Sequence, residues 1–188
     1  MGNSALLVMD VQRDIVELAD QEGSGYLPGV RRAIDGARAA GLPVIYVVIA
    51  LRPGQPDVSP RNKVVTAAVE AGLFSEDATG TEVHPAIAPE PGDIVVTKRR
   101  GSAFSGSDLD LVLRVRGIDH LVLCGIATSG VVLHTLCQAN DLDFGRTVLS
   151  DACLDLDPEV HRFLIGNLFP QWADVLTVDD WVQAITPR

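Results

Sequence analysis

Short aliphatic runs recur along the chain, and their composition constrains the fold more than any other feature. The runs are rich in Val, Ile and Leu, and their apolar residues are continuous rather than alternating with polar ones. They cover residues 5–9, 43–50, 94–97, 121–124, 147–149 and 175–178. Strands of a parallel sheet that is buried on both faces have this composition. The sequence therefore predicts six strands of one parallel sheet.

Amphipathic segments with helical spacing lie between these runs, at residues 30–40, 108–116, 130–141 and 157–169. Asp157 followed by Pro158 is typical of a helix start. Strands that alternate with helices predict a three-layer α/β fold of Rossmann type, with helices on both faces of the parallel sheet. The length fits a single domain, residues 1–188. Two longer connections, 51–62 and 75–93, are expected to be functional or mobile loops.

The composition excludes several classes of partner. The formal net charge of −10 makes the chain a poor match for nucleic acid or an anionic membrane. No apolar run approaches the ~18 residues that a membrane span needs, and the first residues lack a signal-peptide pattern. The three cysteines form no C-x-x-C pair, which argues against a disulfide framework and a zinc site. We expect a cytoplasmic protein with reduced thiols and a small-molecule substrate.

Charged side chains and a glycine-rich turn follow three of the predicted strands. Asp10 follows the first run, Lys98 the third, and the segment 125–130 (GIATSG) the fourth. Ligands bind at the carboxyl ends of parallel strands, so these groups are expected to converge. Asp10 is a candidate general acid or base, Lys98 can hold it or stabilise negative charge, and backbone N–H groups at the helix start can bind an oxyanion. Taken singly, each has an ordinary alternative: a turn residue, a solvated lysine and a plain strand-to-helix turn.

Ordered motifs along the chain resemble the isochorismatase-like (cysteine hydrolase) family. They are Asp10-Val11-Gln12 after a strand, Lys98 followed by Ser102-Ala103-Phe104, the segment 121–132 (LVLCGIATSGVV), and Ser150-Asp151-Ala152. The resemblance implies a six-stranded parallel sheet and a homodimer or homotetramer. Amidase members of that family use an Asp, Lys, Cys triad, whose first two members carry over to Asp10 and Lys98. The resemblance also implies a cis peptide bond before Ala127 and an oxyanion hole made by the N–H groups of Ala127 and Val131.

The sequence departs from the family pattern at the nucleophile. The position of the family's cysteine falls on Val131, which has no nucleophilic atom. Cys124, Cys137 and Cys153 are off the motif, and we expect them to be small buried hydrophobic residues. Some members of the family also lack the cysteine and hydrolyse a vinyl ether. In those members the aspartic acid protonates the alkene carbon and water adds to the resulting cation.

Further residues near the predicted edge of the sheet are assigned to substrate binding: Gln12, Arg52, Phe104, Ala127 and Thr128. Arg52, with Arg99 and Arg100, can bind a carboxylate, although solvated loop charges are the simpler interpretation. Thr128 and Ser129 are interpreted as helix caps rather than replacement nucleophiles, and His134 as a surface or interface residue.

Metal ligands in a D-x-H arrangement follow the second strand in many amidase members. Here the segment 51–57 has no histidine, and Asp57 is interpreted as a turn residue. We therefore predict no metal and no cofactor.

Two functions remain open at this point. The first is a small-molecule hydrolase in which Asp10 and Lys98 assist proton transfer without a cysteine nucleophile. The second is a catalytically inactive member that acts as a ligand-binding or oligomeric assembly protein. Retention of both charged residues favours the first, because an idle buried ion pair contributes little stability. The sequence does not name the substrate.

Overall fold

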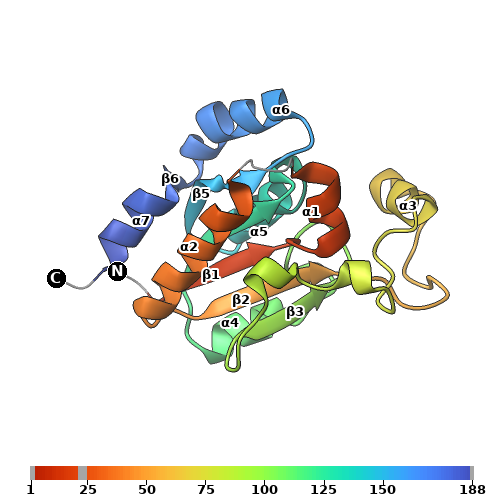
Figure 1. The fold of residues 1–188 in the computed structure, drawn as a ribbon, viewed down its shortest axis with the longest axis horizontal. Helices are drawn as coiled ribbons and strands as arrows, with labels where there is room; N and C mark the ends of the chain where they lie inside the picture. Colours follow the sequence, from red (N-terminus) through yellow and green to blue (C-terminus); the bar gives the residue numbers. More distant parts are fainter. Residues whose placement is uncertain (1–2, 21–24, 187–188) are drawn as a thin grey trace.

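Six parallel strands form the central sheet in the order β3-β2-β1-β4-β5-β6 (Figure 1). The structure is a computed structural model that describes residues 3–20 and 25–186. The strands are β1 (Ser4–Met9), β2 (Val44–Ile49), β3 (Ile94–Lys98), β4 (His120–Ile126), β5 (Gly145–Leu154) and β6 (Asp174–Leu176). The predicted six-stranded parallel sheet is confirmed. Its strand order changes direction at β1 and β4, where open α/β sheets bind ligands.

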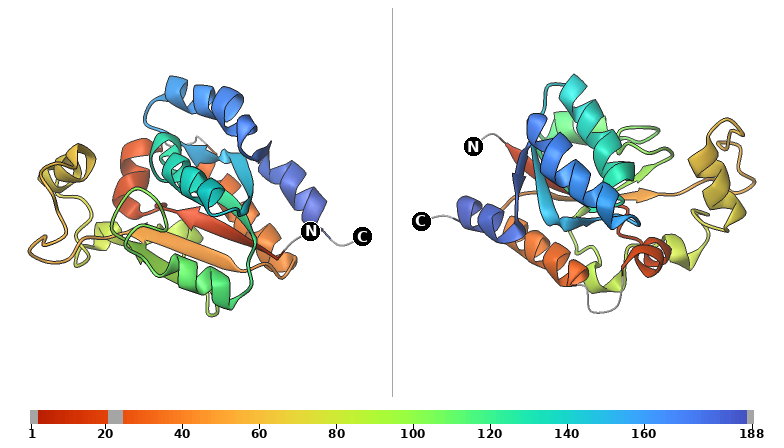
Figure 2. Two further views of the ribbon diagram at one scale, coloured as in Figure 1. Left: turned by 180° about the vertical axis from the view of Figure 1, so that it is seen from behind. Right: turned by 90° about the horizontal axis from the view of Figure 1, so that it is seen from above.

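Helices cover both faces of the sheet and make three layers (Figures 1 and 2). The helices are α1 (Arg13–Ala19), α2 (Tyr26–Ala39), α3 (Lys63–Glu70), α4 (Leu109–Val115), α5 (Leu133–Asp141), α6 (Pro158–Phe163) and α7 (Val178–Ile185). One core lies between the sheet and α1, α2 and α7. The other lies between the sheet and α4, α5 and the turns that continue α6. The predicted three-layer arrangement is therefore confirmed.

Alternate side chains of each central strand enter the two cores. In β1, Leu7 and Met9 face the α4 and α5 side, whereas Leu6 and Val8 face the α2 side. Because both faces are covered, each of these positions must be apolar, which explains the continuous aliphatic runs. Gly125 in β4 has a φ of 147°, and a Cβ there would lie 2.1 Å from the carbonyl oxygen of Met9. Glycine thus lets β1 and β4 approach closely beside the end of β1.

Several element boundaries differ from the sequence prediction. The fifth strand is longer than predicted, so Asp151 and Cys153 lie inside it rather than after it. Val178, assigned to the sixth strand, instead begins α7, because the Thr177 side chain caps that helix by accepting a hydrogen bond from the N–H of Asp180. Asp157 does cap α6, as predicted. The regular α-helix ends at Phe163 and continues as a wider turn, Leu164–Leu168, and a 3-10 turn, Phe169–Gln171.

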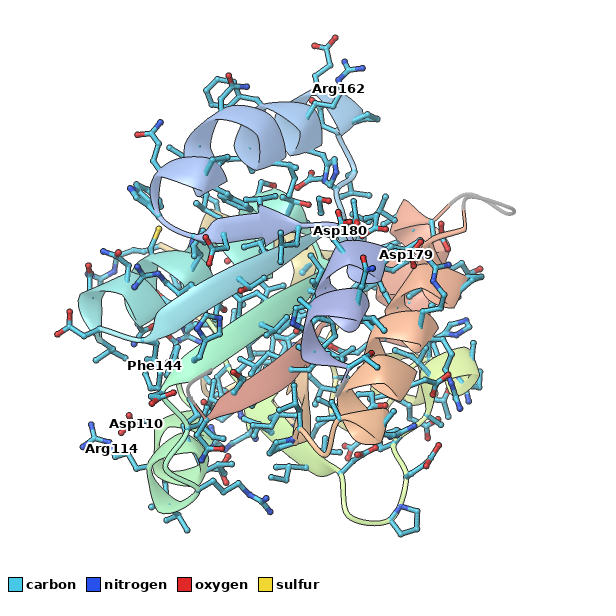
Figure 3. The ribbon with its side chains drawn as sticks, turned by 90° about the vertical axis from the view of Figure 1, so that its left-hand side faces the viewer. Asp110, Arg114, Phe144, Arg162, Asp179 and Asp180 are labelled. Carbon is cyan, nitrogen blue, oxygen red and sulfur yellow. The ribbon has the colours of Figure 1, made fainter. Side chains whose placement is uncertain are left out.

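The chain between β2 and β3 contains a helix that stands apart from the three layers. Helix α3 lies at the side of the molecule, beyond the carboxyl end of the sheet (Figures 1 and 2). The second of the two longer connections, 75–93, contains two 3-10 turns, Thr79–Thr81 and Pro85–Ile87. The end of the molecule away from α3 presents surface charges such as the pair of Asp110 and Arg114, 2.8 Å apart, and the acidic start of α7 (Figure 3). The two ends therefore differ: one carries an added helical arm and the other an ordinary charged surface.

Candidate active site

Asp10 and Lys98 form a buried ion pair at the carboxyl edge of the sheet. The Lys98 Nζ atom lies 2.9 Å from the Asp10 Oδ2 atom, and the side chains are only 1% and 8% exposed for lysine and aspartate respectively. Strand β2 lies between the two strands that carry them, so the long lysine side chain reaches across one strand. Lys98 also donates a hydrogen bond of 2.8 Å to the carbonyl oxygen of Arg100. The structure therefore brings together the two charged residues that the sequence singled out.

The environment of Asp10 changes the pKa and the hydrogen bonding of its carboxyl group. Burial raises the pKa of Asp10 from 3.8 to about 6, although the charge and the hydrogen bond of Lys98 act in the opposite direction. The second carboxyl oxygen, Oδ1, is buried and has no hydrogen-bond partner among the described residues. Asp10 leaves β1 with a left-handed φ of 57°, which aspartate adopts more readily than most residues. A carboxyl group that titrates near neutral pH and has a free oxygen can act as an acid or a base.

The turn after β4 carries the other part of the site. The peptide bond between Ile126 and Ala127 is cis, as the family resemblance implies. The chain then makes one wide helical turn, Thr128–Val132, before α5 begins. Thus the segment that leads to Val131 has an unusual backbone path beside the end of β1.

Side chains from the segment after β5 hold this turn. Asp155 accepts a 2.6 Å hydrogen bond from the N–H of Ser129. The Thr128 hydroxyl lies 2.8 Å from the Nδ1 atom of His161, whose pKa burial lowers. The interpretation of Thr128 or Ser129 as the cap is wrong: neither side chain caps the turn. Asp155 takes that role because it lies directly after β5, next to the start of the turn.

A cavity of about 420 Å³ opens over the ion pair and the turn. Asp10, Lys98, Ala127 and Val131 all line it. Its apolar wall comes mainly from α1, α3 and the segment after α3, and comprises Ile15, Leu18, Ala19, Ile49, Val64, Val65, Leu73, Phe74, Ile126 and Leu156. Asn62, Gly101, Ser129, Gly130 and His134 complete the lining. The enclosed volume is in the range of small-molecule sites.

Four residues predicted to bind substrate do not line this cavity. Gln12 is buried, and its side chain bonds the backbone of Ile49 and Thr81. Phe104 lies in the core beside Phe144. Thr128 is buried against His161, and Arg52 is paired with Asp57. The contacts described for these four side chains are with other parts of the protein and not with the cavity.

The arginines near the site are also held by partners outside the cavity. Arg99 bonds the carbonyl oxygen of Ala50 and lies 2.9 Å from the carboxylate of Glu76. Arg100 bonds the carbonyl oxygens of Arg99 and Asp57. Neither guanidinium group is among the cavity-lining groups of the described residues. The alternative of a carboxylate clamp has no support in this arrangement.

The cysteines lie away from the cavity lining. Cys124 is inside β4 and Cys153 inside β5, and both are buried. Burial raises the pKa of Cys153 to about 12 and that of Cys124 well above its ordinary value. Cys137 lies in α5, partly buried, and its pKa is also raised by desolvation. A thiol needs a lowered pKa to act as a nucleophile at neutral pH, so these environments disfavour that role.

The described residues offer neither a metal site nor a membrane span. They contain no group of three or more His, Cys, Asp or Glu residues arranged to hold a metal ion. No helix in the described part of the chain has the length and apolar character to cross a membrane.

Sequence reasoning missed the groups that shape the cavity. Helix α3 was not predicted, because Val64, Val65 and Val69 are β-branched and dilute the helical pattern. His134 is exposed, as expected for a surface residue, but it also lines the cavity. Asp155 was missed because the fifth strand was predicted too short. The rule that directed attention to Asp10 and Lys98, a polar residue directly after a strand, would have found it.

Comparisons with known proteins agree with this fold. The family profile of the isochorismatase domain matches residues 4–180. The ureidoacrylate amidohydrolase RutB of Variovorax paradoxus is 34% identical, over 99% of this chain and 82% of its own length. An isochorismatase family protein from Burkholderia thailandensis superposes with a TM-score of 0.81 at 30% identity, covering 97% of this chain and 95% of that one. The N-carbamoylsarcosine amidase of Thermoplasma acidophilum superposes with a TM-score of 0.76 at 28% identity, covering 94% and 97% of the two chains.

Proposed function

Because the chain belongs to the isochorismatase-like hydrolase family and is a hydrolase of small molecules, we propose that Asp10 and Lys98 carry its chemistry without a cysteine nucleophile. Asp10 transfers the proton, and Lys98 stabilises negative charge beside it. The observation that carries this proposal is the buried pair itself, which lines a ligand-sized cavity and leaves the buried Asp10 Oδ1 atom without a partner among the described residues. Groups with perturbed pKa values in clefts are characteristic of functional sites.

The proposed reaction is an acid-assisted addition of water. Asp10 in its acid form gives its proton to the substrate, either at an alkene carbon or at a leaving group. Water supplies the oxygen to the activated carbon, and the Asp10 carboxylate removes a proton from that water, which restores the acid form. With an amide, the C–N bond then breaks and the protonated nitrogen leaves as the amine, with a carboxylic acid as the other product. With a vinyl ether, the hemiketal breaks its C–O bond to the ether oxygen, which leaves as an alcohol with the hydroxyl proton, and the other product is a carbonyl compound. A pKa of about 6 leaves both forms of Asp10 populated near neutral pH, as this cycle requires.

Val131 occupies, in this proposal, the position where amidase members carry their cysteine. It lines the cavity at the end of the turn and is almost fully buried. Its side chain excludes a covalent intermediate, so attack by water is direct. The N–H groups of Ala127 and Val131 are the proposed donors to a developing oxyanion.

The substrates named for relatives suggest which compounds to test. One relative is named an amidohydrolase of ureidoacrylate and another an amidase of N-carbamoylsarcosine. A panel of small amides is therefore screened together with isochorismate, which represents vinyl ethers. We expect turnover of at least one compound by the wild-type protein. In Asp10→Asn, which keeps the shape and removes the acid, turnover should fall by about 100-fold to 10,000-fold.

Two further measurements separate this mechanism from its competitors. Alkylation of the wild-type thiols should leave turnover unchanged, because the cysteines do not line the cavity. Val131→Cys should acquire thiol-dependent, alkylation-sensitive amide hydrolysis if position 131 is the nucleophile position. Wild-type activity that alkylation abolishes, or full activity in Asp10→Asn, would contradict the proposal, as would a complete absence of turnover across the panel.

We also propose that the protein assembles as a homodimer or homotetramer. Large apolar side chains are exposed on and beside α6, namely Leu156, Val160 and Phe163. Exposed apolar side chains that lie close together are typical of protein interfaces. Light scattering coupled to size exclusion should give a mass of two or four chains, and a monomeric mass would refute this proposal.

A further inference from the structure

We propose that the cavity takes an uncharged substrate with an apolar body and one polar end. The inference rests on the proposed function only in using Asp10 and Lys98 as the place where the polar end reacts. It concerns the class of molecule, which neither the fold nor the reaction chemistry fixes.

The two charged side chains of the described cavity lining pair with each other and leave no unpaired lysine or arginine for an anionic substrate. Among the described residues that line it, the charged side chains are Asp10 and Lys98, and they are paired with each other at 2.9 Å. The nearby guanidinium groups of Arg52, Arg99 and Arg100 bond other groups outside the lining. A carboxylate that entered this space would lose its hydration without gaining a free cation, which is strongly unfavourable. The acidic chain also repels anions at long range.

The apolar wall is extensive and reaches the mouth of the cavity. Leu18 from α1 and Val64 from α3 line the cavity, yet their residues are 61% and 77% exposed. Leu73 and Phe74 extend the same wall after α3. A ligand with an apolar body would remove these side chains from water, which is the main source of affinity in such a site.

Polar groups of the lining come mainly from the carboxyl edge of the sheet, around the reacting pair; Asn62 and His134 are the others among the described residues. Asp10 lines the cavity, and its Oδ1 atom has no partner among the described residues, so its carboxyl group can accept a hydrogen bond from an N–H or O–H donor of a ligand. Ser129 and the turn that precedes α5 lie on the same lining. A neutral amide, with donors and an acceptor at one end and a hydrocarbon ring at the other, has this distribution of polarity.

Benzamide and 4-carbamoylbenzoate test the inference as a matched pair, because they differ in one carboxylate. Binding of each to the wild-type protein is measured by calorimetry. We expect benzamide to bind about tenfold more tightly or better, since the carboxylate of its analogue finds no partner. Equal or tighter binding of 4-carbamoylbenzoate would overturn the inference, and so would an absence of binding by both compounds.

Two valine variants locate the cause of that preference. Val64→Arg places a cation in the cavity wall, and Val115→Arg places one on α4, where the valine is 78% exposed and does not line the cavity. Both positions are exposed helix residues, so both variants should fold. Val64→Arg should reduce or reverse the preference for benzamide, whereas Val115→Arg should leave it unchanged. An equal effect of the two variants would show that long-range charge, and not the cavity wall, sets the selectivity.

These results are independent of the catalytic proposal. A carboxylated substrate whose turnover depends on Asp10 would refute the inference and leave the proposed function standing. Preferential binding of benzamide, with no dependence of any turnover on Asp10, would refute the function and leave the inference standing.

Discussion

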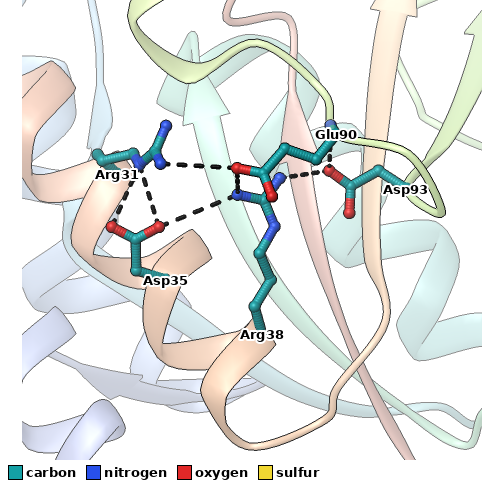
Figure 4. Close-up of polar contacts among 5 residues, drawn as sticks. All are labelled: Arg31, Asp35, Arg38, Glu90 and Asp93. Carbon is teal, nitrogen blue, oxygen red and sulfur yellow. Dashed lines mark hydrogen bonds and ion pairs between the residues drawn. The ribbon is translucent and has the colours of Figure 1, made fainter.

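Two groups of opposite charges in this molecule differ in how completely their members are paired. The pair of Asp10 and Lys98 is buried at the carboxyl edge of the sheet, and one oxygen of Asp10 has no partner among the described residues. The second group, the α2 network, consists of Arg31, Asp35, Arg38, Glu90 and Asp93 (Figure 4). It joins α2 to the connection before β3.

Every member of the α2 network has a charged partner of opposite sign. Arg31 lies 3.0 Å from Asp35 and 3.7 Å from Glu90, and Arg38 lies 2.7 Å from Glu90 and pairs with Asp93. Asp93 also accepts a hydrogen bond from the N–H of Glu90, which closes the turn before β3. Most of these side chains are partly exposed, so water screens them and each pair contributes little stability.

The difference between the two groups separates a structural use of charge from a functional one. The α2 network satisfies its own hydrogen bonds and holds a loop in place. The buried pair leaves a carboxyl oxygen unsatisfied, and burial raises the pKa of Asp10 to about 6 against the effect of Lys98; the missing partner and the burial both oppose stability. A ligand in the cavity would supply the missing partner. We therefore expect substitutions in the buried pair to change turnover, and substitutions in the α2 network to change the free energy of unfolding.

Replacing the lysine of the pair and an arginine of the network by methionine tests this division most strongly. Lys98→Met should lower turnover by about 100-fold to 1,000-fold, because the stabilising cation is lost from a buried site. It should also raise the pKa of Asp10 above about 6, since Lys98 is what lowers that pKa against the effect of burial. Turnover assays and a carboxyl-carbon NMR titration measure the two effects.

Arg38→Met is the matched control for Lys98→Met, because it removes one cation from the α2 network and adds the same side chain. It should leave both turnover and the pKa of Asp10 unchanged. The division fails if the two variants lose similar activity, or if the Asp10 titration stays in place in Lys98→Met.

The pH dependence of stability gives a second, smaller test. The pKa of Asp10 is about 6 in the folded protein and near 3.8 when unfolded, so the folded state binds the proton more tightly. The stability that Asp10 contributes is therefore fully present below about pH 4 and is lost as the pH rises through about 6, a change on the order of 3 kcal/mol.

Comparison with Asp10→Asn isolates this contribution, since other titrating groups are common to both proteins. Urea unfolding at a series of pH values should show the wild-type protein losing stability relative to the variant over that window. A difference between the two proteins that stays constant with pH would mean that the Asp10 pKa is not raised.

The strands of the sheet could be predicted from the sequence, because a sheet that is buried on both faces requires continuous aliphatic runs. Leu6, Leu7, Val8 and Met9 must all be apolar, whereas the helices of the described residues bury one face and need no such run. Helix α3 was not predicted because it lies outside the layers and buries little besides Val65. Three of its eight residues are β-branched valines, which favour strands as much as helices.

The part of the candidate site that the sequence predicted is the part where polar residues directly follow or end a strand. Asp10 and Lys98 follow or end strands, and topology places such residues together. Gln12 and Phe104 were assigned to substrate binding from motifs, but the motifs do not reveal that Gln12 bonds Ile49 and Thr81 or that Phe104 enters the core. The side chains that line the cavity come from segments that are far apart in the sequence. Their contacts depend on how these segments pack, and no local sequence pattern indicates that packing.

The smallest expected effect concerns the stability of the α2 network itself. Arg38→Met removes the ion pairs to Glu90 and Asp93 but keeps much of the apolar stem that covers α2. We expect a loss of about 1 kcal/mol in the free energy of unfolding at low ionic strength. The loss should shrink as salt screens the remaining charges, because these side chains are partly exposed. Urea unfolding of both proteins at two salt concentrations measures it. A loss that salt does not change would mean that Arg38 acts through packing, and the contrast with the buried pair would then rest on the unpartnered oxygen of Asp10 alone.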